Sequence, residues 1–360
     1  MSAISESKSD LERYDRILAE AAAIKGVSLG KDAWRRLRKN PVAMVSLWIL
    51  VIVSLLAVFT PLLPLQAPRK VETSRAFQLP TFTQGGSIDT DRIDAHFGDQ
   101  DPIDAAMISV RVAIFDTWAI PSLFGTDELG RDQLSRLFWG ARVSLVVGLV
   151  ATLVSLVIGV SYGAISGYLG GSIDNLMMRL VDVLYSIPFI FVVIFLITIL
   201  SQKDIKEALE SYGIDRITIF FFVVGAIYWL TMARVVRGQV ISLKNEQFVE
   251  AARTIGGGTF RIVFRHLVPN LFSIVIVYLT LTIPRVMLFE AFLSFLGLGV
   301  QPPDVSWGLL ANTGFKVITP IKIYWWLIVF PGIALGMTLF ALNFLGDGLR
   351  DALDPRMKNR

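Results

Sequence analysis

Six apolar runs alternate with polar segments along the chain, and their lengths predict an all-α membrane protein. The first run, residues 42–64, carries no charged side chain and is long enough to cross a bilayer core of about 30 Å as one helix. The second run predicts a helix at residues 143–165. The remaining runs cover residues 183–202, 217–233, 271–296 and 323–346. We therefore expect six transmembrane helices with both termini on one side of the membrane.

The same pattern divides the chain into five parts. They are an N-terminal segment at 1–41, the first transmembrane helix at 42–64, a polar loop at 65–142, a five-helix core at 143–346 and a tail at 347–360. Residues 10–26 can form a surface helix, and no secretory signal peptide is evident at the N-terminus. Asp99 and Asp101 lie in the polar loop without the spacing of a calcium-binding loop, so their acidic patch is interpreted as solvated.

The distribution of basic residues predicts the orientation. If the N-terminus is cytoplasmic, twenty of the 34 Lys and Arg residues lie in cytoplasmic segments and thirteen lie outside. Eight of the thirteen are in the long loop, where eleven acids offset them and where charge counts least for orientation. We therefore expect both termini, and the polar segment at residues 245–270, to be cytoplasmic.

Composition excludes several kinds of chemistry. The chain is 54% hydrophobic with a mean hydropathy of +0.60, and it contains no cysteine. Its two histidines, His96 and His266, are far apart and suggest neither a metal site nor a Ser-His-Asp site. A phosphate-binding loop is missing, because the nearest match at residues 26–32 lacks the required spacing. Because these motifs are missing, we expect a non-catalytic chain that binds no cofactor or metal. The net charge of +4 is modest, and no nucleic acid is expected as a partner.

The 245–270 segment has the pattern of two short amphipathic helices. Phe248, Ala251, Ala252 and Ile255 share one helical face, and Phe260, Val263, Phe264 and Leu267 repeat that spacing. Three glycines, Gly256 to Gly258, predict a turn between the helices, with Thr259 as the next N-cap and Pro269 as the end of the unit. Such a pair of helices is typical of a docking surface for another protein, but spacing alone does not distinguish it from an ordinary loop between membrane helices. The segment could also be one bent helix instead of two.

Two further features lie within the apolar runs. Gly159, Gly163, Gly167 and Gly171 recur every fourth residue and predict a helix face that another helix approaches closely. Gly332 and Gly336 repeat the spacing in the last run. Arg285 and Glu290 are charged residues within the fifth run, where charge is costly, so we expect one or both to line a translocation path or to meet a partner subunit. The alternative is a hydrated Glu290 near the outer interface.

The 245–270 segment resembles the EAA loop of the permease subunits of ABC importers. Glu250, Ala251, Ala252, Gly256 and Pro269 match that motif, while His266 stands at a position that is usually apolar. Other stretches resemble the C-type permease subunit of oligopeptide and dipeptide importers: AWRRLRKNPVAMVSL, FGTDELGRDQLSR, GYLGGSIDNLMMRLVD, MARVVRGQ, LFEAFLSFLGLGVQPP and GDGLRDALDP. The resemblance covers roughly residues 31–357.

This resemblance implies the MetI-like fold of a type I importer in the inner membrane of a bacterium. It implies a paralogous permease as partner in the pathway, two ABC ATPase subunits that use ATP and Mg²⁺, and an extracytoplasmic peptide-binding protein. Glu250, Ala251, Ala252, Gly256 and Pro269, with Phe248 and Ile255 beside them, would couple the permease to the ATPases. Related permeases serve nickel chelates, glycosides or peptide antibiotics, so these substrates stay open. A secondary transporter or channel and a membrane scaffold are alternatives from other classes.

Overall fold

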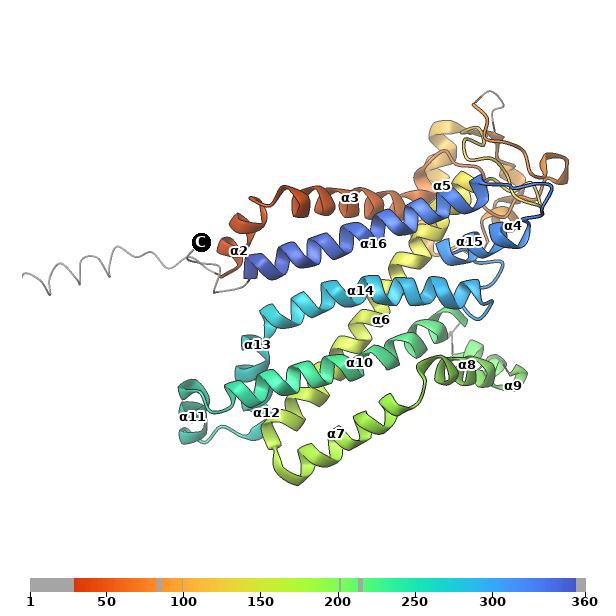
Figure 1. Ribbon diagram of the computed structural model, residues 1–360. Coiled ribbons are helices and arrows are strands. Elements are labelled where there is room, and N and C mark those ends of the chain that lie inside the picture. Colours follow the sequence, from red (N-terminus) through yellow and green to blue (C-terminus); the bar gives the residue numbers. More distant parts are fainter. Residues whose placement is uncertain (1–28, 83–85, 99, 201, 213–215, 354–360) are drawn as a thin grey trace, which may run out of the picture.

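Long helices lying side by side form most of the molecule (Figure 1). The computed structural model describes residues 29–82, 86–98, 100–200, 202–212 and 216–353. The surface helix predicted at residues 10–26 and the predicted solvated position of Asp99 lie outside these residues, as does the end of the predicted tail.

Five helices of the described chain are long and apolar enough to cross a membrane. They are α3 (Pro41–Val58), α6 (Gln133–Leu169), α10 (Arg216–Leu243), α14 (Phe272–Phe295) and α16 (Trp326–Leu353). The pair α7 (Gly171–Ser186) and α8 (Phe189–Leu200) brings the number to six if the two helices form one broken span. These helices confirm the predicted all-α membrane class.

The third predicted span, residues 183–202, is wrong as a straight helix. Its residues belong to α7 and α8, which meet at an angle of 85°. Pro188 explains the break, because proline has no backbone N–H and disfavours helical backbone in the residue before it. Ile187 is accordingly extended, with φ −84° and ψ 124°.

Several other boundaries differ from the prediction. Helix α3 ends at Val58 and is followed by a 3₁₀ turn, η1 (Thr60–Leu62), that contains a proline. Helix α6 begins ten residues before position 143, because Asp132 caps it by accepting the Ser135 N–H at 2.7 Å. With 37 residues, α6 is about 55 Å long and extends beyond a bilayer core. Helices α10 and α16 likewise continue ten and seven residues past their predicted spans.

The predicted polar loop at 65–142 is a small folded unit, because its own apolar side chains form a core. It contains η2 (Thr73–Arg75), η3 (Thr90–Arg92), α4 (Ile93–Phe97) and α5 (Pro102–Phe115). Strands β1 (Gly86–Ser87) and β2 (Trp118–Ala119) pair antiparallel, with Gly86 opposite Ala119. Ala67, Ile88, Phe97 and Ile108 form the buried core, and Trp139 of α6 packs against it.

Helices α6 and α10 pack closely along the glycines of α6. A Cβ on Gly163 would lie 2.3 Å from the Ala233 carbonyl oxygen, and one on Gly167 would lie 2.8 Å from that of Arg237. Gly159 is similarly close to Trp229. The predicted ridge does not continue to Gly171, which lies past the end of α6, and Gly332 and Gly336 have no atom of the described chain within 4 Å of a built Cβ.

The two ends of the molecule carry different elements. At one end lie α2 (Leu29–Leu37), the last turns of α16 and the short helices α11 (Gln247–Thr254), α12 (Thr259–Arg261) and α13 (Val268–Asn270) (Figure 1). At the other end lie α4, α5, α9 (Lys203–Ser211) and α15 (Trp307–Lys316). The described chain therefore begins and ends at the end that carries the 245–270 segment.

Candidate functional site

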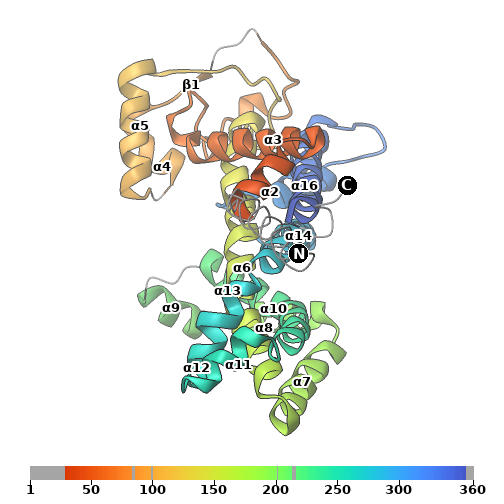
Figure 2. The same cartoon turned by 90° about the vertical axis from the view of Figure 1, so that its left-hand side faces the viewer.

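The 245–270 segment protrudes where α10 ends and α14 begins (Figures 1 and 2). Helix α11 carries Glu250 in its first turn and ends at Thr254. A glycine turn then leads into α12, a π-helical turn at Ile262–Leu267, and α13. The segment is thus two helical pieces joined by a turn, as the spacing predicts, rather than one bent helix.

Gly256 makes the turn possible. Its φ of +84° lies in the left-handed region that favours glycine. The Gly256 N–H donates to the Arg253 carbonyl and the Gly257 N–H to the Ala252 carbonyl, each at 2.9 Å. This pair of hydrogen bonds is the Schellman pattern, which satisfies the last carbonyls of a helix and reverses the chain.

Two details of the second piece differ from the sequence prediction. Gly258, with φ −69° and ψ 156°, is the N-cap of α12, and its carbonyl accepts the Ile262 N–H at 3.0 Å, so Thr259 is the first helical residue. Pro269 does not end the unit, because helical backbone continues through α13 to α14. The π-helical turn lies directly before Pro269, where a regular α-helix would bring the proline ring against the carbonyl four residues earlier.

The inner face of the 245–270 segment is anchored in the helix bundle. Val249 and Ala252 of α11 are buried, as are Ile262, Val263 and Leu267 of the second piece. They share one apolar cluster with Val160 and Ala164 of α6, Val236 and Val240 of α10, and Val275 of α14. A displacement of α11 would therefore move three long helices, because close-packed side chains transmit strain.

The outer face presents apolar and acidic groups to solvent. Ile255 is 85% exposed and Phe260 74% exposed, and Phe248 is also exposed. The Phe260 ring lies 4.5 Å from that of Phe264. Glu250 and Ala251 are exposed beside them. Large apolar side chains this open to water, on a protrusion with a buried base, are typical of a protein-docking surface.

Polar contacts fasten the base of the protrusion to the end of α6. The Lys244 ammonium donates to the Gly167 carbonyl at 3.2 Å. The Arg253 guanidinium donates to the Tyr168 hydroxyl at 3.3 Å and lies 5.2 Å from the centre of its ring. Two long basic side chains thus connect the base of the protrusion to α6, in addition to the apolar cluster.

Asp174 and Arg237 form an ion pair that sequence reasoning missed. The Arg237 Nε and Nη2 atoms donate to the two Asp174 carboxylate oxygens, each at 2.6 Å, and Ser166 of α6 also donates to Asp174. The pair joins α7 to α10 beside the end of α6. Asp174 lies in GYLGGSIDNLMMRLVD and Arg237 in MARVVRGQ, two stretches that carry the family resemblance. They are 63 positions apart, so no spacing along the sequence pairs them.

The two charged residues of α14 point in different directions. Arg285 is exposed. Glu290 is 0% exposed and accepts hydrogen bonds from Ser294 at 2.7 Å and from Ser144 of α6 at 3.5 Å. Ser144 in turn accepts the Trp307 N–H of α15 at 3.1 Å. Within this chain Glu290 thus holds α15 against α6 and α14, and a role for either residue along a path stays a prediction.

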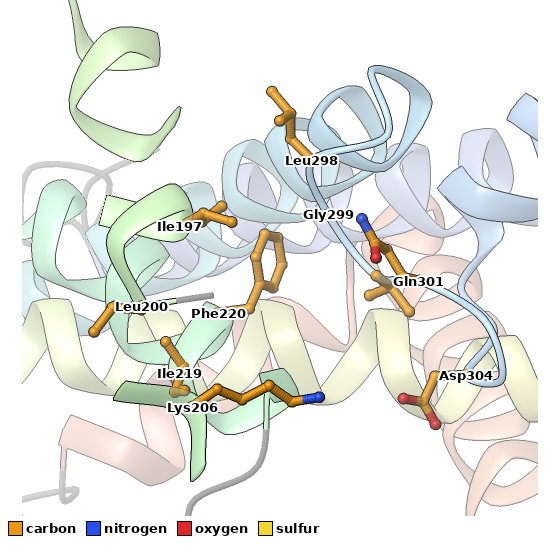
Figure 3. A pocket seen from close by; sticks show the side chains of 10 residues that line it. Ile197, Leu200, Lys206, Ile219, Phe220, Leu298, Gly299, Gln301 and Asp304 are labelled. Carbon is orange, nitrogen blue, oxygen red and sulfur yellow. The ribbon is translucent and has the colours of Figure 1, made fainter. Parts of the chain in front are cut away.

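A pocket of about 160 Å³ lies at the opposite end from the 245–270 segment, between α8, α9, α10 and residues 298–304 (Figure 3). Ile197, Leu200, Ile219 and Phe220 supply apolar walls. In Figure 3 the Lys206 side chain extends towards the side on which Asp304 lies, and Asp304 also pairs with Arg69 at 3.7 Å. The pocket can hold a small group and is too far from α11 to belong to the docking surface.

These features define a multi-span α-helical membrane protein with an exposed, partly apolar protrusion at one end. The family model "Binding-protein-dependent transport system inner membrane component" matches residues 159–359, and the model "N-terminal TM domain of oligopeptide transport permease C" matches residues 28–80. The chain belongs to the family of binding-protein-dependent transport system inner membrane components, and it is a transport permease component of that family.

Two curated relatives are similar in sequence to this chain over nearly its full length. The dipeptide transport system permease protein DppC of Bacillus subtilis is 40% identical over 94% of this chain and 90% of its own. The oligopeptide transport system permease protein OppC of Escherichia coli is 40% identical over 97% of this chain and 98% of its own. A solved structure of the MetNI methionine ABC transporter covers 61% of this chain and 96% of that chain at 16% identity, with a TM-score of 0.47.

Proposed function

We propose that this chain is the permease subunit of an ATP-driven importer of oligopeptides or dipeptides. The observation that carries the proposal is the 245–270 segment, whose exposed apolar and acidic face stands on a base buried among α6, α10 and α14. The names of the full-length relatives, which are oligopeptide and dipeptide permeases, support the substrate class.

The proposed assembly contains four other proteins. A paralogous permease forms the other half of the pathway, and an extracytoplasmic binding protein delivers the peptide. Two ABC ATPase subunits lie on the cytoplasmic side, and the 245–270 segment docks into a groove on one of them. ATP and Mg²⁺ are used by the ATPases, since the sequence offers no phosphate-binding loop. The assembly lies in the inner membrane of a bacterium, with both termini of this chain in the cytoplasm, as the distribution of basic residues favours.

The chemistry of the outer face suggests how an ATPase groove would hold it. Phe248 and Ile255 offer apolar side chains that lose water on docking, and such central apolar contacts carry most of the binding energy of an interface. Ala251 is small enough to allow close approach, and Glu250 can pair with a basic group in the groove. The left-handed Gly256 sets the angle at which α11 meets the rest of the segment.

Movement would pass from this surface into the bundle through its buried base. Closure of the ATPase dimer would push α11, and Val249 and Ala252 would carry the displacement to α6 and α10. Arg237 would then move α7 through Asp174. Rigid-body rotation of packed helices is a common way to expose a pathway alternately to the two sides of a membrane.

The test compares ATP hydrolysis with uptake. The complete transporter is reconstituted in liposomes with its binding protein and a labelled peptide, and Glu250→Lys and Gly256→Asp are introduced separately. We expect each variant to lower uptake about tenfold or more, because a like charge or a changed turn at an interface costs at least about 1.4 kcal/mol. ATP hydrolysis should continue, uncoupled from uptake, and insertion into the membrane should be unchanged.

Two substitutions serve as matched controls. Asp204→Lys makes the same kind of charge reversal on exposed α9, at the other end of the molecule. Gly30→Asp adds the same side chain outside the docking segment, in the first turn of α2, where an acid is favourable and no atom of the described chain lies within 4 Å of a built Cβ. Both should transport at close to the wild-type rate. If Glu250→Lys and Gly256→Asp also transport at close to the wild-type rate, the assignment of the 245–270 segment as the coupling element is wrong.

The substrate is tested separately. The transporter is purified with its binding protein, and the ligand that the binding protein holds is identified by mass spectrometry. A peptide supports the proposal, whereas a nickel chelate or a glycoside would keep the coupling mechanism and reject the substrate. Uptake by this chain without ATPase subunits would instead indicate a secondary transporter.

A further inference from the structure

Helix α5 buries both of its charged residues and exposes a row of apolar residues, the reverse of a water-facing surface helix. It has 14 residues, too few to span a bilayer, and it lies in the segment that the sequence predicts to be a solvated loop. In Figure 2 it stands at the rim of the molecule, apart from the long helices. Its orientation therefore needs a physical explanation.

The inward face of α5 holds the charged residues Asp104 and Arg111 on either side of the buried Ile108. Arg111 is 0% exposed, and its guanidinium donates to the carbonyls of Leu63 at 3.1 Å and Leu65 at 2.9 Å. Asp104 accepts two hydrogen bonds from Arg142 of α6, at 2.6 and 2.7 Å. These bonds fix the rotation of α5 about its axis, so its outer face is set by the structure and not by a loose contact.

The outward face is a continuous apolar stripe. Ile103 is 72% exposed and Ile114 63% exposed, and Val110 and Ala106 lie between them on the same face. The spacing of these residues follows the helical period, so they form one row along the helix. Trp118, just beyond α5, is also half exposed. Water is a poor environment for such a row.

The position of α5 indicates what covers the stripe. Its residues Ile103, Met107 and Val110 line an almost wholly apolar groove of about 480 Å³ together with Phe59 and Leu62. Those two residues directly follow α3, whose 18 residues span about 27 Å and whose outer face, including Ile52 and Leu55, is exposed and apolar. The groove is thus continuous with the surface of a membrane-spanning helix, at the depth where the hydrocarbon core ends.

We propose that α5 is an interfacial helix whose Ile103–Ile114 stripe contacts phospholipid acyl chains at the membrane boundary. Its buried Asp104 attaches it to Arg142 in the first third of α6, and Arg111 attaches it to the chain after α3, while the apolar groove accepts the ends of acyl chains. An exposed tryptophan beside it fits the aromatic belt of a membrane interface. The helix would brace α3 against α6 from the lipid side and keep the folded segment at a fixed depth.

The test measures the surroundings of single positions on α5. The chain contains no cysteine, so one introduced cysteine can carry a fluorescent nitrobenzoxadiazole label in a transporter whose other subunits are cysteine-free. Ile103→Cys and Ile114→Cys place the label on the stripe. Ser109→Cys places it on an exposed flank of the same helix, outside the stripe, as the matched control. The labelled transporter is reconstituted in vesicles of phosphatidylethanolamine and phosphatidylglycerol.

We expect nitroxide-bearing phospholipids to quench the labels at positions 103 and 114 several-fold more than the label at 109. Aqueous iodide should show the opposite order. The proposal fails if iodide quenches all three positions equally, which would indicate a water-facing helix. It also fails if positions 103 and 114 are shielded from both quenchers, which would indicate that a protein subunit covers the stripe. Neither result depends on the peptide substrate or on coupling to ATPases.

Discussion

Arg237 of α10 and Asp174 of α7 form a two-pronged ion pair in which both nitrogen–oxygen distances are 2.6 Å. Ser166 of α6 donates to the same carboxylate, so three helices meet at one buried acid. The pair lies where the 245–270 segment is attached, because Lys244 of that region also bonds to Gly167 at the end of α6. Movement of the segment would therefore reach this junction as well as the apolar cluster at its base.

Neutralising Asp174 should loosen the junction. We expect Asp174→Asn to lower the free energy of unfolding by about 1.5–3 kcal/mol, the usual range for hydrogen bonds to charged groups, and to reduce coupled uptake. Thermal unfolding of the subunit in detergent measures the first effect. Asp182→Asn is the control, since Asp182 pairs with Arg234 at the same distance of 2.6 Å but on an exposed surface. That pair should contribute less than about 1 kcal/mol, and equal losses in the two variants would contradict this interpretation.

The close approach of α6 to α10 gives a steric prediction. In Gly163→Ala the new Cβ would lie 2.3 Å from the Ala233 carbonyl oxygen, so the helices must separate. We expect a loss of about 1–3 kcal/mol, the usual effect of overpacking. Gly336→Ala adds the same methyl group where no atom of the described chain lies within 4 Å, and should be neutral or stabilising by up to about 1 kcal/mol. The prediction fails if both alanines shift the unfolding temperature alike.

Much of the membrane core could be predicted from the sequence, because each span is a local run of apolar residues. Local signals also located the turn at Gly256, where a glycine triplet follows an amphipathic spacing. Pro188 by itself predicts a bend. The apolar residues on both sides of it form one continuous run, however, and such a run predicts a single straight span. Similarly, Pro269 is tolerated inside helical backbone because a π-helical turn precedes it, an adjustment that no residue type announces.

Contacts between distant residues were beyond sequence reasoning. Asp174 and Arg237 are 63 positions apart, and Ser144 and Glu290 are 146 positions apart, so their pairing depends on the tertiary arrangement. The sequence predicts a solvated acidic loop at the start of α5, because acidic residues precede the helix and continue into its first turn. The charges of the helix itself are buried, since Arg111 finds backbone carbonyls at 2.9 and 3.1 Å, and the apolar side is the exposed one.

Glu290 is expected to act mainly as an acceptor that secures α15. Glu290→Gln keeps an oxygen that can accept from Ser294, so we expect nearly unchanged unfolding and transport. Glu290→Ala removes both acceptors and leaves a cavity, and should lower the free energy of unfolding by about 2–4 kcal/mol. Thermal unfolding and peptide uptake are measured for both variants. If Glu290→Gln abolishes uptake without unfolding the subunit, the carboxyl group itself is needed along the pathway.

Asp132 gives the structure a pH-dependent element at the start of α6. Burial is the main cause that raises the pKa of this carboxyl group to about 6 from an ordinary 3.8, although the Ser135 N–H and the charge of Arg75 act in the opposite direction. The folded state therefore binds a proton more tightly than the unfolded state. Its stability falls as the pH rises from about 4 to 6 and then stays level, because above that range the carboxyl group is ionised in both states.

Replacing Asp132 with asparagine should remove this dependence. A shift of about two pKa units corresponds to about 3 kcal/mol, so at pH 7.5 we expect Asp132→Asn to be more stable than the wild type by up to that amount. At pH 4 the two should differ little, since asparagine caps a helix as well as aspartate does. The measurement is the difference in unfolding temperature between variant and wild type across this pH range, which cancels the titration of other groups. If Asp132→Asn is instead less stable than the wild type at pH 7.5 and equally stable at pH 4, the ionised carboxylate stabilises the fold through Ser135 and Arg75.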